Sequence, residues 1–243
     1  MTGRGPTTGL FGAELRVEHL SKRFGGLRVL EDISFRLAPG EVLGVISTHG
    51  AGKSSTINAV IGLVPTCGGT IWFDGCDIGA LSADRCARAG IGYSPEGRRI
   101  FSTLTVRDNV LTGGFGRGRA HQVKAYDWLC SVFPLIAERA WQPAGLLSGG
   151  QQQIVALARA MWSFPRLILL DEPFLGLAPV WIDRISGAIR ELQARGTTIL
   201  MTEQMARPAL KLARRGYIMR GGEVRRSGTV AEIRDLALAE EYL

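Results

Sequence analysis

Three short apolar runs, each followed by a segment with helical periodicity, constrain the fold of this chain more than any other feature. The apolar runs span 41–46, 167–170 and 197–201, and the helical patterns follow at 53–63, 180–194 and 205–213. Strands that alternate with helices form a parallel sheet, because each helix must return the chain to the edge where the next strand begins. The sequence therefore predicts an α/β domain.

The remaining segments are predicted to extend this sheet or to interrupt it. Further strands are expected at 15–17, 29–37 and 70–73, and a hairpin at 217–226 around Gly221-Gly222. Residues 95–163 contain no convincing buried strand and show helical patterns instead, near 105–111, 121–133 and 151–162. We therefore expect a disordered tail at 1–13 and one domain at 14–243, with a helical subdomain inserted at about 95–163.

Composition excludes several classes of protein. The four cysteines form no CxxC pair, which favours reduced thiols in a cytosolic protein over a zinc site. No apolar run approaches the roughly 18 residues of a membrane span, and the N-terminus lacks the apolar core of a secretory signal. The net charge of +7 leaves nucleic acid, an anionic membrane and a phosphorylated ligand open as partners. Glycine supplies 32 of 243 residues, which indicates loops whose backbone approaches a ligand closely.

The stretch STHGAGKS lies between a predicted strand and a predicted helix. Backbone N–H groups at such a turn point at an anion, and Gly50 and Gly52 let the backbone curl. Lys53 would reach the β- and γ-phosphates of a nucleotide, and the Ser54 hydroxyl would ligate Mg²⁺. The strict phosphate-loop pattern has Gly where this chain has Ser47, so an ordinary glycine-containing turn remains an alternative. The predicted nucleotide contacts of this loop are Ser47, His49, Gly50, Ala51, Gly52, Lys53, Ser54 and Ser55.

Two neighbouring carboxylates, Asp171 and Glu172, end a predicted apolar strand. A parallel sheet places the carboxyl ends of its strands at the same edge, so both acids are expected beside the phosphate loop. Asp171 would belong to the Mg²⁺ shell, and Glu172 would orient or deprotonate the attacking water. The alternative is a pair of acids that caps the next helix.

The string Leu147-Ser148-Gly149-Gly150-Gln151 precedes an amphipathic helix and provides a second helix N-terminus suited to phosphate. A plain helix cap is the structural alternative. With the phosphate loop before it and the acid pair after it, however, the chain resembles the ATP-binding subunit of an ABC transporter from about Glu14 to its C-terminus. The resemblance implies a P-loop NTPase fold with a RecA-like parallel sheet core, an N-terminal antiparallel β subdomain and an inserted helical subdomain.

A narrower resemblance is to the LIV-type ATPase of branched-chain amino-acid importers. The strings that carry it are SPEGRRIF at 94–101, LTV at 104–106, LSGGQQQ at 147–153, LGLAP at 175–179 and Glu203-Gln204.

The resemblance assigns further site residues. Phe24 occupies the position of the aromatic ring that stacks on adenine, with a core phenylalanine as the alternative. The resemblance implies that two such subunits pack head to tail with ATP at their interface. Ser148, Gly149 and Gly150 would then bind the ATP of the partner subunit. ATP binding would favour the closed dimer and hydrolysis would let it reopen.

Two polar positions near the γ-phosphate are also implied by the resemblance. Glu96 stands where most relatives have a glutamine that senses Mg²⁺ and the attacking water, and it is expected to act in catalysis and metal binding. Gln204 stands where most relatives have a histidine that bonds the γ-phosphate. Ser47 and Phe174 depart from the family pattern without a subfamily precedent, and we hypothesise that they slow hydrolysis at this subunit's own site.

The resemblance implies ATP and Mg²⁺ as cofactors and a peripheral location on the cytoplasmic face of the membrane. The implied partners are two transmembrane permease subunits, a second ABC ATPase subunit and an extracytoplasmic solute-binding protein, with no nucleic acid. A mixed ATPase dimer is favoured, with a homodimer as the alternative. Branched-chain amino acids are the expected solutes, with amides or urea as alternatives, and a regulatory ATP-binding subunit with little turnover remains a competing function. Chromosome-type ATPases of the same superfamily carry long coiled coils between the phosphate-loop lysine and the LSGGQ string. The 95 residues from Lys53 to Ser148 show no such coiled coil, which argues against a role on DNA.

Overall fold

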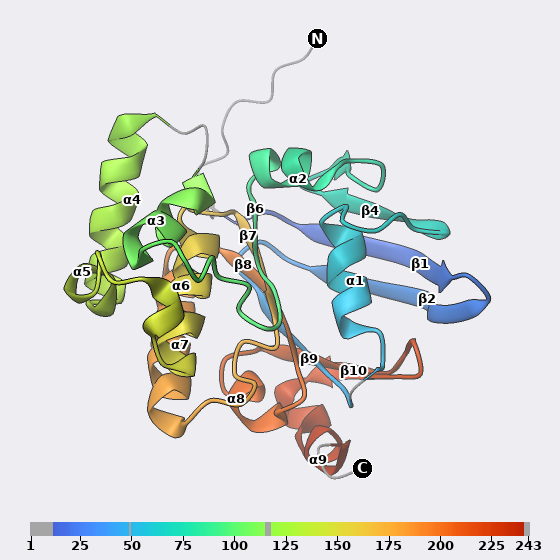
Figure 1. The fold of residues 1–243 in the computed structure, drawn as a ribbon. Coiled ribbons are helices and arrows are strands. Elements are labelled where there is room, and N and C mark those ends of the chain that lie inside the picture. Colours follow the sequence, from blue (N-terminus) through green and yellow to red (C-terminus); the bar gives the residue numbers. More distant parts are fainter. Residues whose placement is uncertain (1–11, 49, 115–117, 241–243) are drawn as a thin grey trace.

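The computed structural model describes residues 12–48, 50–114 and 118–240, and these residues form two sheets with helices around them (Figure 1). The strands of the larger sheet are β3 (Val42–Ile46), β6 (Ile91–Ser94), β7 (Leu167–Asp171), β8 (Thr198–Glu203), β9 (Arg215–Arg220) and β10 (Glu223–Thr229). They lie in the order β10-β9-β3-β8-β7-β6, and all neighbours pair in parallel except β10 with β9. The predicted parallel sheet is confirmed, and the hairpin at its edge is too.

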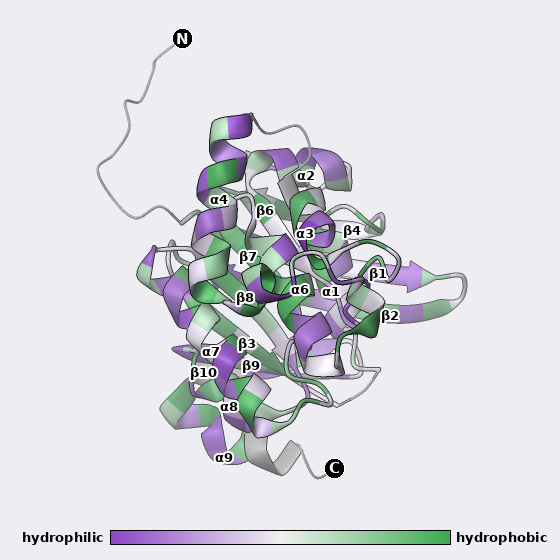
Figure 2. Ribbon diagram, turned by 60° about the vertical axis from the view of Figure 1, so that its left-hand side comes forward, coloured by the Kyte–Doolittle hydropathy of each residue, from purple (hydrophilic) through white to green (hydrophobic). Residues whose placement is uncertain are grey.

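The central strands β3, β7 and β8 are buried at every position, and most of their residues are apolar. Val42 and Ile46 of β3 belong to one core cluster, whereas Leu43 and Val45 belong to another. The period of two along a strand therefore divides each strand between two cores. Figure 2 shows the central strands mostly in the green of hydrophobic residues.

The smaller sheet is antiparallel and covers one face of the larger one. Its strands are β1 (Leu15–Phe24), β2 (Leu27–Leu37), β4 (Gly68–Phe73) and β5 (Cys76–Asp77), in the order β2-β1-β4-β5. Leu15 pairs with Leu37 on one side and with Phe73 on the other, so an apolar row crosses the sheet. This row shares a core with α1 (Lys53–Val60) through Ile57 and Val60.

Helices pack on the opposite face of the larger sheet. They are α3 (Val106–Leu111), η1 (Thr112–Gly114), α4 (Arg119–Val132), α5 (Leu135–Glu138), η2 (Ala144–Leu146), α6 (Gly149–Met161), α7 (Pro179–Ala194), α8 (Ala206–Leu210) and α9 (Val230–Glu240). Helices α3 to α7 form the lobe on the left of Figure 1, and α8 and α9 lie at the bottom of that view. Between β6 and β7 the described residues form helices and no named strand, as the sequence predicts for the insertion.

Several short elements were not predicted from the sequence, among them α2 (Ala83–Ala89) and the edge strand β6. β6 is only four residues long and contains Gly92, which weakens a strand signal. The glycine is required by packing, since a Cβ at Gly92 would lie 2.6 Å from the carbonyl oxygen of Ala160 in α6. A contact between distant segments thus explains a residue that local propensity disfavours.

The predicted tail at 1–13 lies outside the described residues except for its last two positions, and these are packed. Ala13 is buried, and its carbonyl accepts a hydrogen bond of 2.8 Å from Thr198 Oγ1. A Cβ at Gly12 would lie 2.7 Å from the backbone nitrogen of Gly40. Among the described residues, no helix has the length and apolar character that a bilayer crossing requires.

Candidate functional site

The loop from Ser47 to Gly52 joins β3 to α1, as the sequence predicts. Gly50 and Gly52 have φ angles of +78° and +98°, a region in which side chains are strained. A Cβ at Gly52 would also lie 2.6 Å from Leu30 Cδ2, so glycine is needed there for space as well. His49, a predicted nucleotide contact, lies outside the described residues.

The ammonium group of Lys53 is enclosed by the loop that precedes it. Lys53 is 4 % exposed, and its Nζ donates to the carbonyl oxygens of Ser47 at 3.0 Å and Thr48 at 2.9 Å. The same Nζ lies 3.2 Å from Oε1 of Glu172. Within the described part of the chain no side chain caps the N-terminus of α1, so its first N–H groups can bind an anion.

A cavity of about 190 Å³ opens beside Lys53. It is lined by Val29, Gly50, Gly52, Lys53, Ser54, Ser55, Glu96 and Glu172. The structure therefore brings together three groups that are far apart in the sequence: the phosphate loop, Glu96 and Glu172. Ala51, in the same loop, is buried, and its carbonyl accepts a hydrogen bond from the N–H of Gly222 at 3.2 Å.

Asp171 ends β7 and is 2 % exposed. Its Oδ1 accepts a 2.6 Å hydrogen bond from Thr202 Oγ1. Burial raises the pKa of Asp171, and hydrogen bonds from the Thr202 and Ser54 hydroxyl groups oppose that rise. A carboxylate beside a serine hydroxyl offers the hard oxygen ligands that Mg²⁺ takes together with water and phosphate oxygens, so the residues present fit this ion.

Glu172 is held in place from several directions. Its backbone is left-handed, with φ of +48°, and its N–H donates to the carbonyl of Thr202 at 3.0 Å. Gln204 Nε2 donates to both carboxylate oxygens of Glu172 at 3.1 Å. Lys53 and Gln204 thus contact the carboxylate together, which the sequence did not reveal although it had singled out all three residues.

The loop that carries Glu96 is anchored to α6. Arg98 and Arg99 have φ angles of +65° and +45°, and their carbonyl oxygens accept hydrogen bonds from Arg159 NH2 at 3.3 and 2.9 Å. Burial lowers the pKa of the Arg159 guanidinium. Because Arg159 belongs to α6, it connects the loop of Glu96 to the helix that begins after Ser148.

Ser148, Gly149 and Gly150 lie at the start of α6 and outside the cavity at Lys53, as far as the described residues define it. Ser148 caps the helix, and its N–H donates to Gln151 Oε1 at 2.9 Å in a capping box. Ser148 is exposed. A Cβ at Gly149 would lie 2.8 Å from Arg98 NH2, and one at Gly150 would clash with the Trp181 ring. The two glycines therefore let the side chains of Arg98 and Trp181 pack closely against the start of α6.

Phe24 ends β1 and does not line the cavity at Lys53 within the described part of the chain. Its ring is 49 % exposed, so the alternative of a core phenylalanine is excluded. The Lys22 ammonium lies 4.6 Å from the ring centroid and is fixed by a 2.6 Å hydrogen bond to the carbonyl of Pro65. Phe24 is thus an exposed aromatic ring with a cation beside it.

The two departures from the family pattern occupy different environments. Ser47 is 2 % exposed, and its Oγ donates to the carbonyl of Thr48 at 3.2 Å, within the loop. Phe174 is 0 % exposed, and its ring packs into the core on the helical side of the larger sheet. Of these two residues, only Ser47 has its side chain in the phosphate loop, where it could affect ATP binding.

Three residues at the site were missed by sequence reasoning. Val29 lines the cavity, Thr202 bonds Asp171, and Glu203 accepts a hydrogen bond of 2.8 Å from the N–H of Phe174. The one signal available was an acidic residue, Glu203, at the end of a predicted buried strand.

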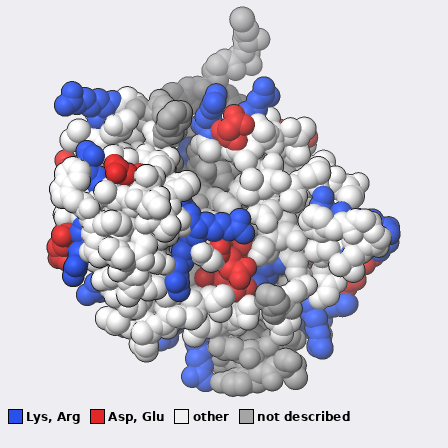
Figure 3. All heavy atoms as spheres, in the orientation of Figure 1, with Lys and Arg blue, Asp and Glu red and all other residues white. Residues whose placement is uncertain are grey.

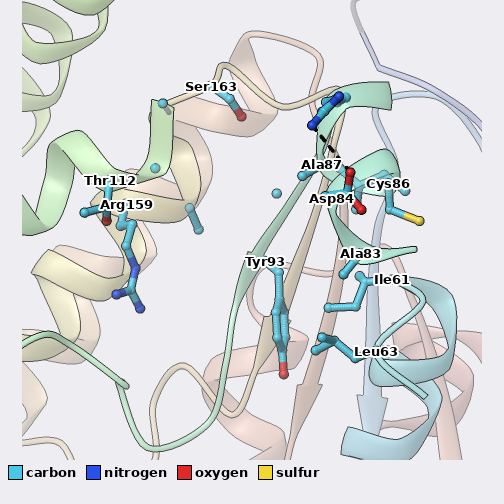
Figure 4. A pocket seen from close by; sticks show the side chains of 16 residues that line it. Ile61, Leu63, Ala83, Asp84, Cys86, Ala87, Tyr93, Thr112, Arg159 and Ser163 are labelled. Carbon is cyan, nitrogen blue, oxygen red and sulfur yellow. Dashed lines mark ion pairs between the residues drawn. The ribbon is translucent and has the colours of Figure 1, made fainter. Parts of the chain in front are cut away.

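A larger cleft of about 440 Å³ lies between the helical lobe and the α1–α2 side of the molecule (Figure 4). Thr112, Arg159 and Ser163 stand on one side of it, and Tyr93 lies between them and the opposite wall. That opposite wall contains Ile61, Leu63, Ala83, Asp84, Cys86 and Ala87. Asp84 also forms an ion pair of 3.5 Å with Arg88.

The sequence of this chain matches the family described as ABC transporter over residues 30–175. The chain belongs to the ABC transporter family. It is 39 % identical over 210 residues to a high-affinity branched-chain amino acid transport ATP-binding protein, BraG of Pseudomonas aeruginosa. These 210 residues are 86 % of this chain and 90 % of the relative. It is 34 % identical over 230 residues to the lipopolysaccharide export system ATP-binding protein LptB of Escherichia coli K12, with 91 % and 92 % covered.

Solved structures of ABC ATPases share the fold. The ADP conformation of MJ1267, an ATP-binding cassette of an ABC transporter, matches with a TM-score of 0.85 and 26 % identity over 95 % of this chain and 98 % of that one. An ATP-binding subunit of another ABC transporter matches with a TM-score of 0.81 and 29 % identity over 94 % and 97 %. The chain is therefore an ATP-binding, ATP-hydrolysing subunit with a P-loop NTPase fold, and its predicted resemblance to branched-chain amino-acid transport ATPases is confirmed.

Proposed function

We propose that this chain drives the import of branched-chain amino acids by hydrolysing ATP at the cavity beside Lys53. The observation that carries the proposal is the meeting of Lys53, Glu96 and Glu172 at one cavity, on a chain that is 39 % identical to BraG.

The phosphate loop binds the triphosphate. The N–H groups at the start of α1 and the Lys53 ammonium attract the β- and γ-phosphates. To reach them, Lys53 exchanges its contacts with Ser47, Thr48 and Glu172 for phosphate oxygens. Ser54 and Asp171 would hold Mg²⁺, which neutralises charge that develops on the phosphates.

Glu172 and Gln204 act on the attacking water. When Lys53 turns to the phosphates, the Glu172 carboxylate gains a free oxygen that can accept a hydrogen bond from water. Gln204 keeps the carboxylate oriented through its Nε2 donor. The water oxygen bonds to the γ-phosphorus, the bond to the bridging oxygen breaks, and ADP and inorganic phosphate form while Glu172 accepts the water proton. Glu96, which lines the same cavity, adds oxygen ligands at its edge.

A second ATPase subunit completes the site. Ser148, Gly149 and Gly150 form a helix N-terminus whose first residue is exposed and which, among the described residues, does not line this subunit's own cavity, so we assign it to the ATP of the partner. Phe24 stacks on the adenine of this subunit's own ATP through its exposed ring face. The partner is a similar ATPase or a second copy of this chain.

Two permease subunits receive the motion, and this places the chain at the cytoplasmic face of the membrane. The cleft in Figure 4 is a suitable dock for a cytoplasmic segment of a permease, because it lies between the two parts of the subunit that ATP would move relative to each other. Arg159 lines this cleft and also holds the loop of Glu96, so docking and the ATP site share one residue. On the face drawn in Figure 3, Lys and Arg lie among Asp and Glu. This mixture favours a solvated charged surface over a continuous basic groove that would bind a polyanion such as nucleic acid.

The test is uptake by the transporter reconstituted from this chain and its co-purified membrane partners. We expect ATP-dependent uptake of leucine, isoleucine and valine, and none when the chain carries Glu172→Gln. Uptake of amides or urea alone would contradict the solute assignment while leaving the ATPase role intact.

Lipopolysaccharide export is a second candidate, because the relatives also include LptB at 34 % identity. A strain that lacks this chain distinguishes the two. Loss of branched-chain amino-acid uptake with normal surface lipopolysaccharide supports import, and the reverse result supports export.

A further inference from the structure

Glu203, the last residue of β8, lies in the interior beside the ATP site and has no role in the function proposed above. Its side chain is 0 % exposed. β8 lies between β3, which leads into the phosphate loop, and β7, which ends in Asp171. Glu203 is therefore placed between the two segments that must cooperate in hydrolysis.

The two ends of Glu203 bond to those two segments. Its carbonyl oxygen accepts the N–H of Ser47 at 3.1 Å, where the phosphate loop begins. Its Oε1 accepts the N–H of Phe174 at 2.8 Å, two residues after Glu172. Its Oε2 is buried and has no hydrogen-bond partner among the described residues. Of these contacts, the side-chain bond to Phe174 is the one that depends on residue type.

Glu172 requires such support because its backbone is strained. A non-glycine residue with φ of +48° costs on the order of 1 kcal/mol and persists only when its surroundings enforce it. Three consecutive residues provide this enforcement. Thr202 accepts the Glu172 N–H, Glu203 accepts the Phe174 N–H, and Gln204 donates to the Glu172 carboxylate.

An acid in this place can accept a hydrogen bond without repelling Glu172. Burial raises the pKa of Glu203 to about 8, and the nearby Glu172 charge contributes to that rise. At neutral pH the side chain is therefore mostly a neutral carboxylic acid. Its carbonyl-type oxygen still accepts the Phe174 N–H.

We propose that Glu203 is a positioning residue for ATP hydrolysis, which fixes Glu172 relative to the phosphate loop through its side-chain bond to the Phe174 N–H and its main-chain bond to the Ser47 N–H. The proposal rests on the role assigned to Glu172 above. It predicts that the acceptor oxygen is what matters, and that the negative charge is dispensable.

Three variants of the full-length chain in its transporter complex test this. Glu203→Gln keeps the acceptor oxygen and the shape. Glu203→Leu removes the acceptor and leaves the Phe174 N–H unpaired. Thr197→Val is the matched control, since it removes one buried hydrogen bond (Thr197 Oγ1 to the carbonyl of Pro165, 3.2 Å) just before the opposite end of β8. kcat, KM for ATP and thermal stability are measured for each variant.

We expect Glu203→Leu to lower kcat about tenfold or more with KM within about twofold, because misplacement of a catalytic group by about 1 Å can cost roughly 10²-fold. Glu203→Gln should restore kcat to within about twofold of the wild type, and Thr197→Val should lower stability but leave kcat unchanged. The proposal is overturned if Glu203→Leu behaves like Thr197→Val, or if Glu203→Gln loses as much kcat as Glu203→Leu.

Two further measurements keep the outcome decisive. Hydrogen exchange at the Phe174 amide of the wild-type chain needs no variant: protection supports the proposal, and free exchange overturns it even if Glu203→Leu does not fold. Glu172→Gln separates this proposal from the one on which it rests. If Glu172→Gln retains full kcat, the catalytic role of Glu172 fails; if only Glu203→Leu is without effect, the role of Glu203 alone fails.

Discussion

Lys53 Nζ and Glu172 Oε1 lie 3.2 Å apart, and both side chains are buried. The ammonium that is to bind the γ-phosphate thus neutralises the carboxylate that is to orient the water. ATP binding has to separate the pair, since Lys53 has its other contacts in the same loop. This arrangement keeps two buried charges compensated until a triphosphate supplies a replacement for the carboxylate.

The buried pair predicts a non-additive effect on stability. Lys53→Met leaves the Glu172 charge without its cation and should lower the free energy of unfolding by about 3 kcal/mol. Lys53→Met combined with Glu172→Gln removes both charges and should recover a large part of that loss. Urea unfolding of the two single variants and the double variant gives the coupling directly. Strictly additive losses would mean that the two charges do not interact.

Glu203 predicts a pH dependence of stability. Its pKa is raised from 4.5 to about 8 by burial in the folded chain, so between these values the folded state keeps a proton that the unfolded state has lost. The contribution of Glu203 to the free energy of unfolding should therefore be largest below about pH 4.5, fall as pH rises, and level off above about pH 8. Burial of Asp171 acts in the same direction, so the comparison is made with Glu203→Gln, which should show a smaller decline. Equal pH slopes for the two proteins would contradict this assignment.

Ser47 and Phe174 predict different outcomes when they are replaced by the residues that the family pattern leads one to expect. Phe174→Ser removes a fully buried ring and should destabilise the fold by about 3–5 kcal/mol. Ser47→Gly changes only the loop, so it is the clean test of whether this departure slows hydrolysis. Under that hypothesis, Ser47→Gly raises kcat. An unchanged kcat, measured at saturating ATP, would refute it.

If the exposed ring of Phe24 stacks on adenine, its removal should weaken binding of ATP but not of a ligand that lacks the base. Phe24→Ala should weaken ATP binding by about 0.5–1.5 kcal/mol, up to roughly tenfold, while Phe24→Tyr keeps the stacking face and the affinity. Leu27→Ala is the matched control, because Leu27 pairs with Phe24 in register and is 68 % exposed. Isothermal titration with ATP and with inorganic triphosphate separates the base from the phosphates. Equal weakening for both ligands would place Phe24 away from the adenine.

The sequence predicted those parts of the site that are built from contiguous residues. The phosphate loop, the Asp171-Glu172 pair and the capped helix at Ser148 each depend on a short string, and local geometry follows from such strings. The parallel order of the larger sheet followed from strands that alternate with helices.

The remaining features depend on contacts between distant segments. Gly92 weakens the strand signal of β6, yet close packing against Ala160 requires it. Phe174 was singled out as a residue that slows hydrolysis, whereas its ring lies in the core and its N–H bonds to Glu203. Glu203 resembles a polar strand end in the sequence, and its burial between β3 and β7 becomes evident only in the folded sheet.

The most direct test of the account is the rate of ATP hydrolysis by the transporter complex carrying Glu172→Gln, beside Glu191→Gln on the exposed surface of α7 as a control. We predict that Glu172→Gln lowers kcat by about 10²-fold or more while ATP still binds, since Lys53 no longer has a charged competitor for the phosphates. Glu191→Gln should hydrolyse ATP at the wild-type rate. Wild-type turnover in the Glu172→Gln complex would contradict the account.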